Sequence, residues 1–272
     1  MPSNEQRRAA AQRKLERQLA NRAARARKRK QLTIAGSVLG VVVLVAAGVG
    51  VYFLTKGDDD KSKDAALAGS VNCTYNASRQ PAAKPVNKPR TDGIKTTGGD
   101  AKLSVSMDTS AGPIGLTLNN AKAPCTVNSF ASLVGQKYFD GTTCHRMTAG
   151  EGLKVLQCGD PTGTGTGGPG YTFDDEYPAN QFPPGDPSAQ MPIPYKRGVV
   201  AMANGGPSTN GSQFFLVYGD SQLPPAYTIF GTVDEPGLAT LDKIAAAGQD
   251  NSGGQGDGKP NVPVEIKNIQ ID

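Results

Sequence analysis

The only histidine in the chain, His145, lies in the stretch TTCHRMTAGEGLKVLQCGD (residues 142–160), between Cys144 and Cys158. Three kinds of chemistry suit such a cluster: a metal site, a cysteine nucleophile with a histidine base, or catalysis by the neighbouring Arg146. A zinc site needs four soft or imidazole ligands, usually with paired Cys-x-x-Cys spacing, and the sequence lacks that spacing. Cys144 and His145 are adjacent on a predicted strand, so their side chains point to opposite faces. We therefore expect no metal and no cofactor, and Arg146 remains as the candidate.

Arg146 faces away from His145 and Met147 on this alternating strand. If a glutamine of a neighbouring strand shares its face, the arginine lies on a concave barrel surface, where small barrels bind their ligands. The alternative is a solvated surface charge, which is the usual environment of an arginine.

The four cysteines suggest disulfides, because they all lie on what we predict below to be the exported side of a membrane. If the strands TTCHRM and KVLQC pair as antiparallel neighbours, Cys144 and Cys158 face one another in a cross-strand disulfide. Elimination then pairs Cys73 with Cys125. The alternative is that the cysteines are free buried thiols.

Hydrophobic patterning predicts a mainly β fold. Period-two alternation in KLSVSMDTSAGPIGLTLN (102–119), interrupted by Ala-Gly-Pro, predicts a β-hairpin. Residues 121–138 predict a helix with Pro124 in its first turn, and residues 238–248 predict a second helix. Further short strands are predicted at residues 142–147, 154–158, 198–203, 213–218, 227–233 and 262–271. Many short strands with two helices favour a closed or nearly closed antiparallel barrel with helical caps.

Two glycine-rich stretches resemble nucleotide-binding loops but lack the context of such loops. GTGTGG (163–168) is followed by Pro169-Gly170 and not by a helix that could hold a pyrophosphate. GGQGDGKP (253–260) has Pro260 where a phosphate loop has the Ser or Thr that binds magnesium. Neither stretch predicts a nucleotide site.

The N-terminal part of the chain predicts a membrane anchor. Residues 1–31 carry a net charge of +9 and the whole chain +5, so the remainder carries −4 and a nucleic-acid-binding domain is not expected. LTIAGSVLGVVVLVAAGVGVYFL (32–54) has no charge over 23 residues, enough to cross a bilayer core of about 30 Å. The basic flank places residues 1–31 in the cytosol and the remainder outside the cell membrane. A cleaved signal peptide, which usually has a shorter apolar region, is the alternative. Residues 55–100, which are polar and rich in Lys, Asp, Pro and Gly, predict an extracytoplasmic tether, and residues 101–272 a folded domain.

From about Lys102 to Asp272 the sequence resembles the cyclophilin family of peptidyl-prolyl cis/trans isomerases, and with its tail and anchor it resembles the membrane-anchored cyclophilins of actinobacteria. The resemblance rests on seven ordered blocks: YFDG (138–141) leading to His145-Arg146, LQCGD (156–160), GTGTGG (163–168), MAN (202–204), Gly206-Pro207, NGSQFF (210–215) and Phe230-Gly231. It implies a closed eight-stranded antiparallel β-barrel capped by two α-helices. It also implies a proline-containing polypeptide as the partner, without a cofactor.

The resemblance assigns the site residues as follows. Arg146 would donate hydrogen bonds to the twisting prolyl bond, Gln157 would hold the arginine and the substrate backbone, and Asn204 would grip the peptide as an extended strand. The substrate-contacting residues would be Ala203, Gln213, Phe215 and Leu223, with Met202 packing nearby. Strand alternation predicts that Phe214 points inward and Phe215 toward the groove.

Two departures from the family pattern change the expected pocket. The segment TAGEGLKV stands where the family commonly has a Pro-Gly-Phe-Met turn, so Leu153, Lys154 or Val155 must fill the space of the missing phenylalanine. Tyr227 replaces the usual histidine at the pocket rim.

We expect a monomeric prolyl isomerase that acts on exported or membrane proteins as they fold. The alternative is a proline-peptide-binding chaperone module with little or no isomerase activity, which a turnover assay would distinguish from the enzyme. A third possibility, an anchored barrel with only an architectural role, would leave Arg146 without a function.

Overall fold

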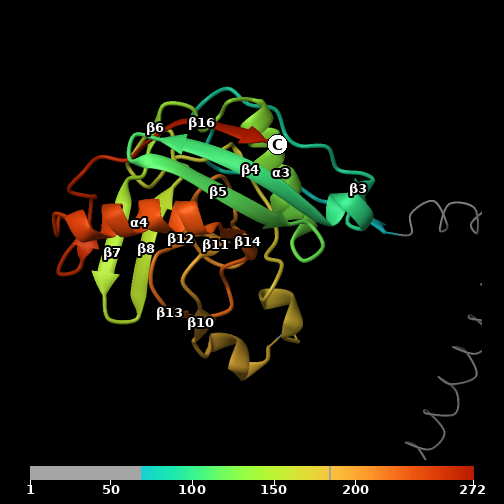
Figure 1. Ribbon diagram of the computed structural model, residues 1–272. Coiled ribbons are helices and arrows are strands. Elements are labelled where there is room, and N and C mark those ends of the chain that lie inside the picture. Colours follow the sequence, from blue (N-terminus) through green and yellow to red (C-terminus); the bar gives the residue numbers. More distant parts are fainter. Residues whose placement is uncertain (1–68, 184) are drawn as a thin grey trace, which may run out of the picture. The chain divides into compact units, whose positions relative to one another are not determined.

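The computed structural model describes residues 69–183 and 185–272 of the chain (Figure 1). The predicted basic tail (1–31), the predicted anchor (32–54) and the first part of the predicted tether lie outside these residues. Within the described part, no helix is both long and apolar enough to span a bilayer. The described residues belong to one compact unit.

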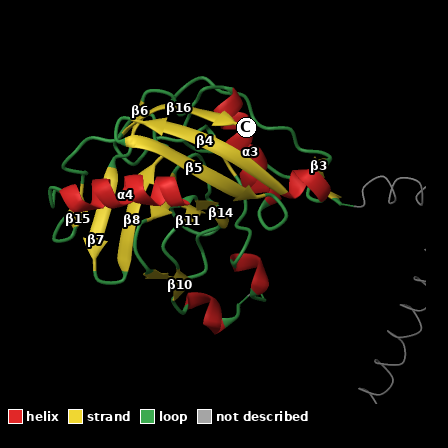
Figure 2. Cartoon of the chain, in the orientation of Figure 1, coloured by secondary structure: helices red, strands yellow, loops and turns green. Residues whose placement is uncertain are grey.

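The described part of the chain is built around one ten-stranded sheet with the strand order β15-β7-β8-β12-β11-β14-β5-β4-β16-β6, in which all neighbouring strands are antiparallel (Figure 2). In chain order these strands are β4 (Lys102–Thr109), β5 (Gly112–Asn119), β6 (Thr142–Thr143), β7 (Arg146–Gly150), β8 (Leu153–Cys158), β11 (Val199–Met202), β12 (Phe214–Val217), β14 (Ile229–Val233), β15 (Asp257–Gly258) and β16 (Glu265–Ile271). The predicted hairpin corresponds to β4 and β5. The predicted strand 142–147 is interrupted at Cys144 and His145, and the bounds of the other predicted strands lie within three residues of the observed ones.

The prediction of a closed eight-stranded barrel is wrong in its closure and its strand number. The strand order begins at β15 and ends at β6, and no backbone ladder joins these two strands in the described part of the chain. β6 and β7 follow each other in the chain, separated only by Cys144 and His145. β6 pairs with β16, whereas β7 pairs with β8 and β15, so two residues of chain link the end strand β6 to the strand beside the other end strand, β15. The result in the described part is a half-barrel whose two end strands are not joined by a ladder of hydrogen bonds.

Two α-helices accompany the sheet, as the sequence predicts. α3 (Pro124–Gly135) buries Val127, Phe130 and Val134, and Pro124 begins it, where the missing N–H leaves no helical hydrogen bond unmade. The half-buried carboxylate of Glu176 caps α3 by accepting from the backbone N–H groups of Cys125 and Thr126 at 3.0 and 2.8 Å. α4 (Glu235–Ala247) packs against β5, and the side chain of Asp234 accepts from the N–H of Gly237 in its first turn.

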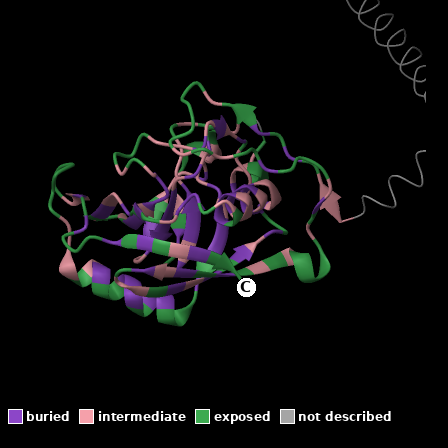
Figure 3. Ribbon diagram, turned by 90° about the horizontal axis from the view of Figure 1, so that it is seen from above, coloured by how far each residue is buried: buried purple, intermediate pink, exposed green. Residues whose placement is uncertain are grey.

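Many residues of the strands are buried (Figure 3), and the buried apolar residues form two clusters. On β12, Phe214 and Leu216 belong to the main core with α3, whereas Phe215 and Val217 belong to a second, smaller cluster. This alternation confirms the prediction that Phe214 points inward and Phe215 to the other face.

The second cluster is covered by the long segment between β8 and β11. Here lie β9 (Tyr171–Thr172), two short 3-10 helices (Ala179–Gln181 and Pro187–Gln190) and β10 (Ile193–Tyr195), and β10 pairs with β13 (Ser221–Leu223). Tyr195 is fully buried, and its hydroxyl donates to the carbonyl oxygen of Tyr227 at 2.8 Å. This segment therefore supports the loop that carries Leu223 and Tyr227.

Residues 69–100, which the sequence assigned to the tether, pack on the folded domain. β1 (Ser70–Val71) pairs with β3 (Ile94–Lys95), and β2 (Asn76–Ala77) pairs with β9. A 3-10 helix (Gly98–Ala101) leads into β4. Cys73, Tyr75 and Ile94 are buried in the main core cluster. A disulfide and polar contacts fix much of this segment in place. It therefore needs no periodic pattern of apolar residues to pack on the domain.

Candidate active site

Arg146 lies at the start of β7, between a carboxylate and an amide. Its Nε donates to both carboxylate oxygens of Asp257 at 2.9 and 3.1 Å, and its Nη2 donates to Oδ2 at 2.6 Å. Its Nη1 donates to Oε1 of Gln157, which faces it across the β7–β8 ladder, at 3.2 Å. The side chains of Arg146 and Asp257 are 40% and 31% exposed, so the guanidinium is held at the surface and remains open to solvent.

The guanidinium keeps two N–H groups available. An arginine side chain has five N–H donors in a fixed planar fork. The Nε proton and one Nη2 proton go to Asp257, and one Nη1 proton goes to Gln157. One proton on each Nη therefore has no acceptor among the described residues. The hydrogen bonds to Asp257 raise the pKa of the guanidinium further, so both protons stay in place at any working pH.

Gln157 continues the polar chain away from Arg146. Its Nε2 donates to Oε1 of Gln213 at 2.9 Å, and Gln213 in turn donates to the carbonyl oxygens of Gly165 and Gly167 at 2.9 and 3.0 Å. The side-chain amide of each glutamine accepts a hydrogen bond with its oxygen and donates one with its nitrogen. These bonds fix the orientation of each amide group.

The glycine-rich loop that ends this chain is folded around the fully buried Asp160. Burial by itself would raise the pKa of this carboxyl, but donors from Thr162, Gly167 and Gly165 outweigh that effect and bring the pKa below its ordinary value. The N–H of Gly165 lies 2.6 Å from Oδ2, and a Cβ at Gly167 would collide with the carboxylate. The stretch 163–168 is therefore a loop held by an internal carboxylate, as its lack of a following helix indicated.

An apolar pocket adjoins the arginine on the same side of the sheet. Phe215 pairs with Gln157 in the β12–β8 ladder and contacts the ring of Tyr227 edge to face, with 5.9 Å between the ring centroids. The buried floor consists of Val155, Tyr195, Ala201, Phe215 and Val217, and the partly exposed neighbours include Leu153, Ala203, Leu223 and Tyr227. Leu153 and Val155 thus supply apolar surface beside the arginine, and Leu153, Leu223 and Tyr227 are partly exposed there.

Asn204 follows β11 and borders the pocket described next. Its Nδ2 donates to the carbonyl oxygen of Ala226 at 2.8 Å, and its Oδ1 accepts from the N–H of Gly206 at 3.2 Å. The N–H of Ala203 donates to the carbonyl oxygen of Gln213 at 3.0 Å, so this loop is tied to the amide chain.

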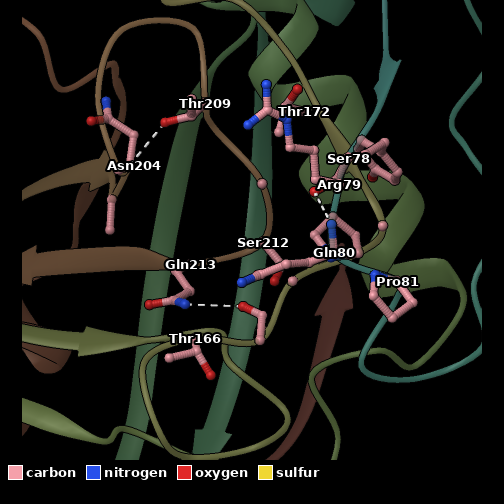
Figure 4. A pocket seen from close by; sticks show the side chains of 18 of the residues that line it. Ser78, Arg79, Gln80, Pro81, Thr166, Thr172, Asn204, Thr209, Ser212 and Gln213 are labelled. Atoms are coloured by element: carbon pink, nitrogen blue, oxygen red, sulfur yellow. Dashed lines mark hydrogen bonds between the residues drawn. The ribbon is translucent and has the colours of Figure 1, made fainter.

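A second, larger pocket of about 730 Å³ lies beside the amide chain (Figure 4). Gln157, Gln213, Asn204 and the glycine-rich loop line one part of it. The other part is lined by Ala77–Pro81, which we call the strap. Figure 4 shows Ser78, Arg79, Gln80 and Pro81 grouped on one side, with Asn204 and Thr209 on the other.

The structure brings most of the predicted site residues together but not Met202. Met202 faces Phe214 across the β11–β12 ladder and is buried in the main core, whereas Ala201 shares the face of Phe215. Asp257 is not predicted from the sequence; it lies 111 positions from Arg146, within the stretch GGQGDGKP. β15 places it, because Asp257 and Gly258 pair with Thr148 and Met147 of β7. A carboxylate flanked by two glycines was the only available signal.

The cysteines and His145 have structural roles. Cys144 is bonded to Cys158, and Cys73 to Cys125, with Cα–Cα distances of 4.0 and 5.4 Å. No cluster of His, Cys, Asp and Glu in the described residues is placed to hold a metal ion. Both ring nitrogens of His145 are buried without a hydrogen-bond partner in the described part, and burial lowers the pKa of the ring. His145 therefore packs as a neutral ring against the glycine-rich loop, where a Cβ at Gly165 would contact it at 3.5 Å.

Comparison with known proteins agrees with this geometry. The pattern of the family described as cyclophilin type peptidyl-prolyl cis-trans isomerase/CLD matches residues 104–271. A protein of Mycobacterium leprae named "Probable peptidyl-prolyl cis-trans isomerase B" is 50% identical over the whole of both chains. A protein of the same name from Mycobacterium tuberculosis is 55% identical over 202 residues, which are 74% of this chain and 64% of that protein.

The fold also matches solved structures. A crystal structure of a Cryptosporidium parvum cyclophilin type peptidyl-prolyl cis-trans isomerase is 33% identical, with a TM-score of 0.50 over 63% of this chain and 98% of that one. A second structure of the same protein, with the same identity and TM-score, was determined in the presence of the dipeptide Ala-Pro. The chain belongs to the cyclophilin-type peptidyl-prolyl cis-trans isomerase family, and it is an enzyme of that class.

Proposed function

We propose that this isomerase acts on Xaa-Pro bonds of exported or membrane polypeptides, outside the cell membrane and on a single N-terminal anchor. The anchor is supported by the uncharged run at residues 32–54 and its basic flank. The extracytoplasmic side is supported by the two disulfides of the folded domain, because disulfides persist mainly in oxidising compartments. The clients are proline-containing chains, and the enzyme is a monomer.

The proposed mechanism follows from what the prolyl bond requires. Amide resonance makes the bond partly double and sets a barrier of about 18–20 kcal/mol. As the bond twists, the prolyl nitrogen regains its lone pair and becomes a hydrogen-bond acceptor. The two free N–H groups of Arg146 are donors in a fixed position that engage the substrate most strongly in this twisted state. Interactions that are stronger in the transition state than in the ground state lower the barrier.

The other residues hold the substrate while the bond rotates. Phe215, Leu223 and Tyr227 bind the proline ring in the apolar pocket, and Leu153 and Val155 complete its wall. Gln157 and Asn204 hold the backbone of the substrate next to the two unpaired N–H groups of Arg146. No covalent intermediate is needed, because the bond only rotates.

The observation that carries this proposal is an arginine with two N–H groups unpaired among the described residues, beside a partly exposed apolar cluster. Exchange NMR on a short Ala-Pro peptide tests it, with the wild-type protein and Arg146→Ala compared at equal concentration. We expect the wild type to accelerate cis/trans exchange and the variant to lose most of that acceleration. Equal acceleration by both proteins would contradict the role of Arg146.

A proline-peptide-binding module is the second candidate, because the wall of the pocket is made by Leu153 and Val155 where the family commonly has a phenylalanine turn. The same experiment separates the two functions. A binding module would broaden or shift the peptide signals without accelerating exchange.

A further inference from the structure

The strap adds a wall to the larger pocket from outside the segment that matches the family. The family pattern begins at residue 104, whereas the strap comprises Ala77–Pro81. The pocket shares Gln157 and Asn204 with the proposed catalytic site, so a substrate bound there also passes the strap. Any selectivity that the strap confers therefore belongs to this chain and not to the matched domain alone.

The strap is fixed on both of its sides. On its N-terminal side, the Cys73–Cys125 disulfide and the pairing of Asn76 and Ala77 with β9 hold the chain. The N–H of Ser78 then donates to the carbonyl oxygen of Gly170 at 3.0 Å. On its C-terminal side, the N–H of Ala83 donates to the carbonyl oxygen of Gly168 at 2.9 Å.

Side-chain contacts reinforce this position. The ring of Tyr75 packs edge to face against Tyr171 and Phe173, with centroid distances of 5.5 and 5.7 Å. Lys84 donates to the carbonyl oxygens of Tyr138 and Asp140 at 3.2 and 2.8 Å. The backbones also approach closely, since a Cβ at Gly170 would lie 2.9 Å from the N atom of Ala82. The strap is thus a fixed wall, and the position of Arg79 on it is defined.

Arg79 is the only charged residue that lines this pocket. The remaining lining residues present hydroxyls, amides, backbone groups and small apolar side chains, among them Thr166, Thr209 and Gln213 (Figure 4). Arg79 is exposed and forms no ion pair with any residue in the described part of the chain. An unpaired guanidinium on the wall of an otherwise neutral pocket favours a carboxylate, to which it can donate two parallel hydrogen bonds.

The register of β12 indicates where such a carboxylate lies in the substrate. Gln213, at the base of the larger pocket, precedes Phe215 of the proline pocket by two residues. Extended chain rises about 3.3 Å per residue, so Gln213 and Phe215 are about 7 Å apart along the chain. An extended peptide covers this length with two residues and reaches the strap with a third.

We propose that Arg79 makes this isomerase selective for clients with an acidic residue two or three positions from the proline. This inference rests on the proposed function, because it assigns a substrate class to the same site. The free guanidinium binds the acidic side chain while the proline occupies the Phe215 pocket.

The test uses the full-length chain in a non-ionic detergent and matched Ala-Pro peptides that carry Glu or Gln at one position, two or three residues from the proline on either side. The readout is the ratio of kcat/KM for the Glu peptide to that for the Gln peptide. We expect a ratio of about three to five at one position for the wild type, the size of an exposed ion pair. The ratio should fall to about one in Arg79→Gln and below one in Arg79→Glu. It should also shrink in about 0.5 M salt, which screens exposed charges.

Arg90→Gln is the matched control, because Arg90 is an exposed arginine of the same N-terminal segment that does not line the pocket. This variant should keep the wild-type ratio. A ratio of about one for the wild type at every position, or an unchanged ratio in Arg79→Gln, would overturn the inference.

Failure of the inference is distinguishable from failure of the proposed function. If exchange is accelerated equally for Glu and Gln peptides, only the inference fails. If no peptide is accelerated, the proposed function fails, and the Kd values of the two peptides from NMR titration decide the inference. The Glu peptide should then bind about three to five times more tightly to the wild type and no more tightly to Arg79→Gln.

Discussion

The contact between Asp257 and Arg146 leads to a prediction that separates positioning from catalysis. Asp257→Asn removes the charged partner that takes two of the five N–H groups of the guanidinium, through Nε and Nη2. The amide that replaces the carboxylate has one uncharged acceptor oxygen, so the remaining contacts lose their charge assistance. Arg146 keeps its charge and its contact with Gln157 but is held less firmly on the Asp257 side.

The size of the effect follows from the exposure of the pair. Charge-assisted hydrogen bonds contribute about 1.5–3 kcal/mol when they are shielded from water. Exposed ion pairs contribute about 0.2–1 kcal/mol. Because the two side chains are 40% and 31% exposed, we expect the upper end of the exposed range, about 1 kcal/mol. If this energy is lost from the positioning of the transition state, kcat/KM falls roughly fivefold.

Arg146→Ala provides the scale for this number, because it removes the donors themselves. Loss of one preorganised donor to a developing charge lowers kcat by about 10²–10³. The assay is exchange NMR on an Ala-Pro peptide over a range of peptide concentrations. We expect Asp257→Asn to lower kcat while KM stays within about twofold, because the proline pocket is unchanged.

Asp242→Asn is the matched control for the loss of one carboxylate charge. It breaks an ion pair with Arg197, in which Nη2 lies 2.7 Å from Oδ2, on α4 and away from the site residues. This control should retain wild-type activity. Wild-type activity in Asp257→Asn would show that Arg146 needs no carboxylate to hold it. A loss as large as that in Arg146→Ala would show that Asp257 does more than position the arginine.

Three further predictions concern stability. Asp160→Asn should lower the free energy of unfolding by at least about 2 kcal/mol, since the carboxylate accepts several buried hydrogen bonds, and urea denaturation at pH 7 measures this. The depressed pKa of Asp160 also means that its contribution is complete above about pH 4 and is lost as the pH falls through the lower folded-state value, so wild type and variant should converge in acid. The pKa of His145 is lowered by burial, so stability should fall as the pH drops below about 6.5, by up to about 1.4 kcal/mol per pH unit, and His145→Gln should remove this slope. The comparison with His145→Gln isolates the histidine from Glu176, whose raised pKa acts in the opposite direction. Replacing both Cys73 and Cys125 by Ser opens a link across 52 residues and should lower the free energy of unfolding by up to about 4 kcal/mol. The local readout is new tryptic cleavage at Arg79. Resistance of that site to trypsin would show that polar contacts alone hold the strap.

Much of the fold is predictable where side chains alternate about a buried face. The hairpin of β4 and β5 follows its period-two pattern over eight residues in each strand. α3 and α4 have a proline in their first turn and an apolar stripe, and both lie where the pattern places them. Phe214 and Phe215 were assigned to opposite faces from alternation alone, and the two buried clusters confirm it.

The parts that escaped prediction are held by contacts between residues far apart in the sequence. Closure of a sheet depends on how its two end strands meet, and in the described part of the chain the end strands β15 and β6 pair only with β7 and β16, whose partners lie far apart in the sequence. Residues 69–100 bury few apolar side chains and are held by a disulfide and polar contacts, which leave no periodic signal. Asp257 is a surface carboxylate in a glycine-rich turn, and only the pairing of β15 with β7 brings it to Arg146.

The environment of His145 explains why its neighbour can act as the functional group. Cys144 and Cys158 are bonded to each other, so neither can serve as a thiolate beside the imidazole. The ring nitrogens are buried without partners in the described residues, so the ring is kept neutral and can accept no proton without cost. Arg146, the next residue, begins β7, where Asp257 and Gln157 hold it and solvent reaches it. The chain thus buries the ring nitrogens of the histidine and, one residue later, leaves the guanidinium open to a substrate.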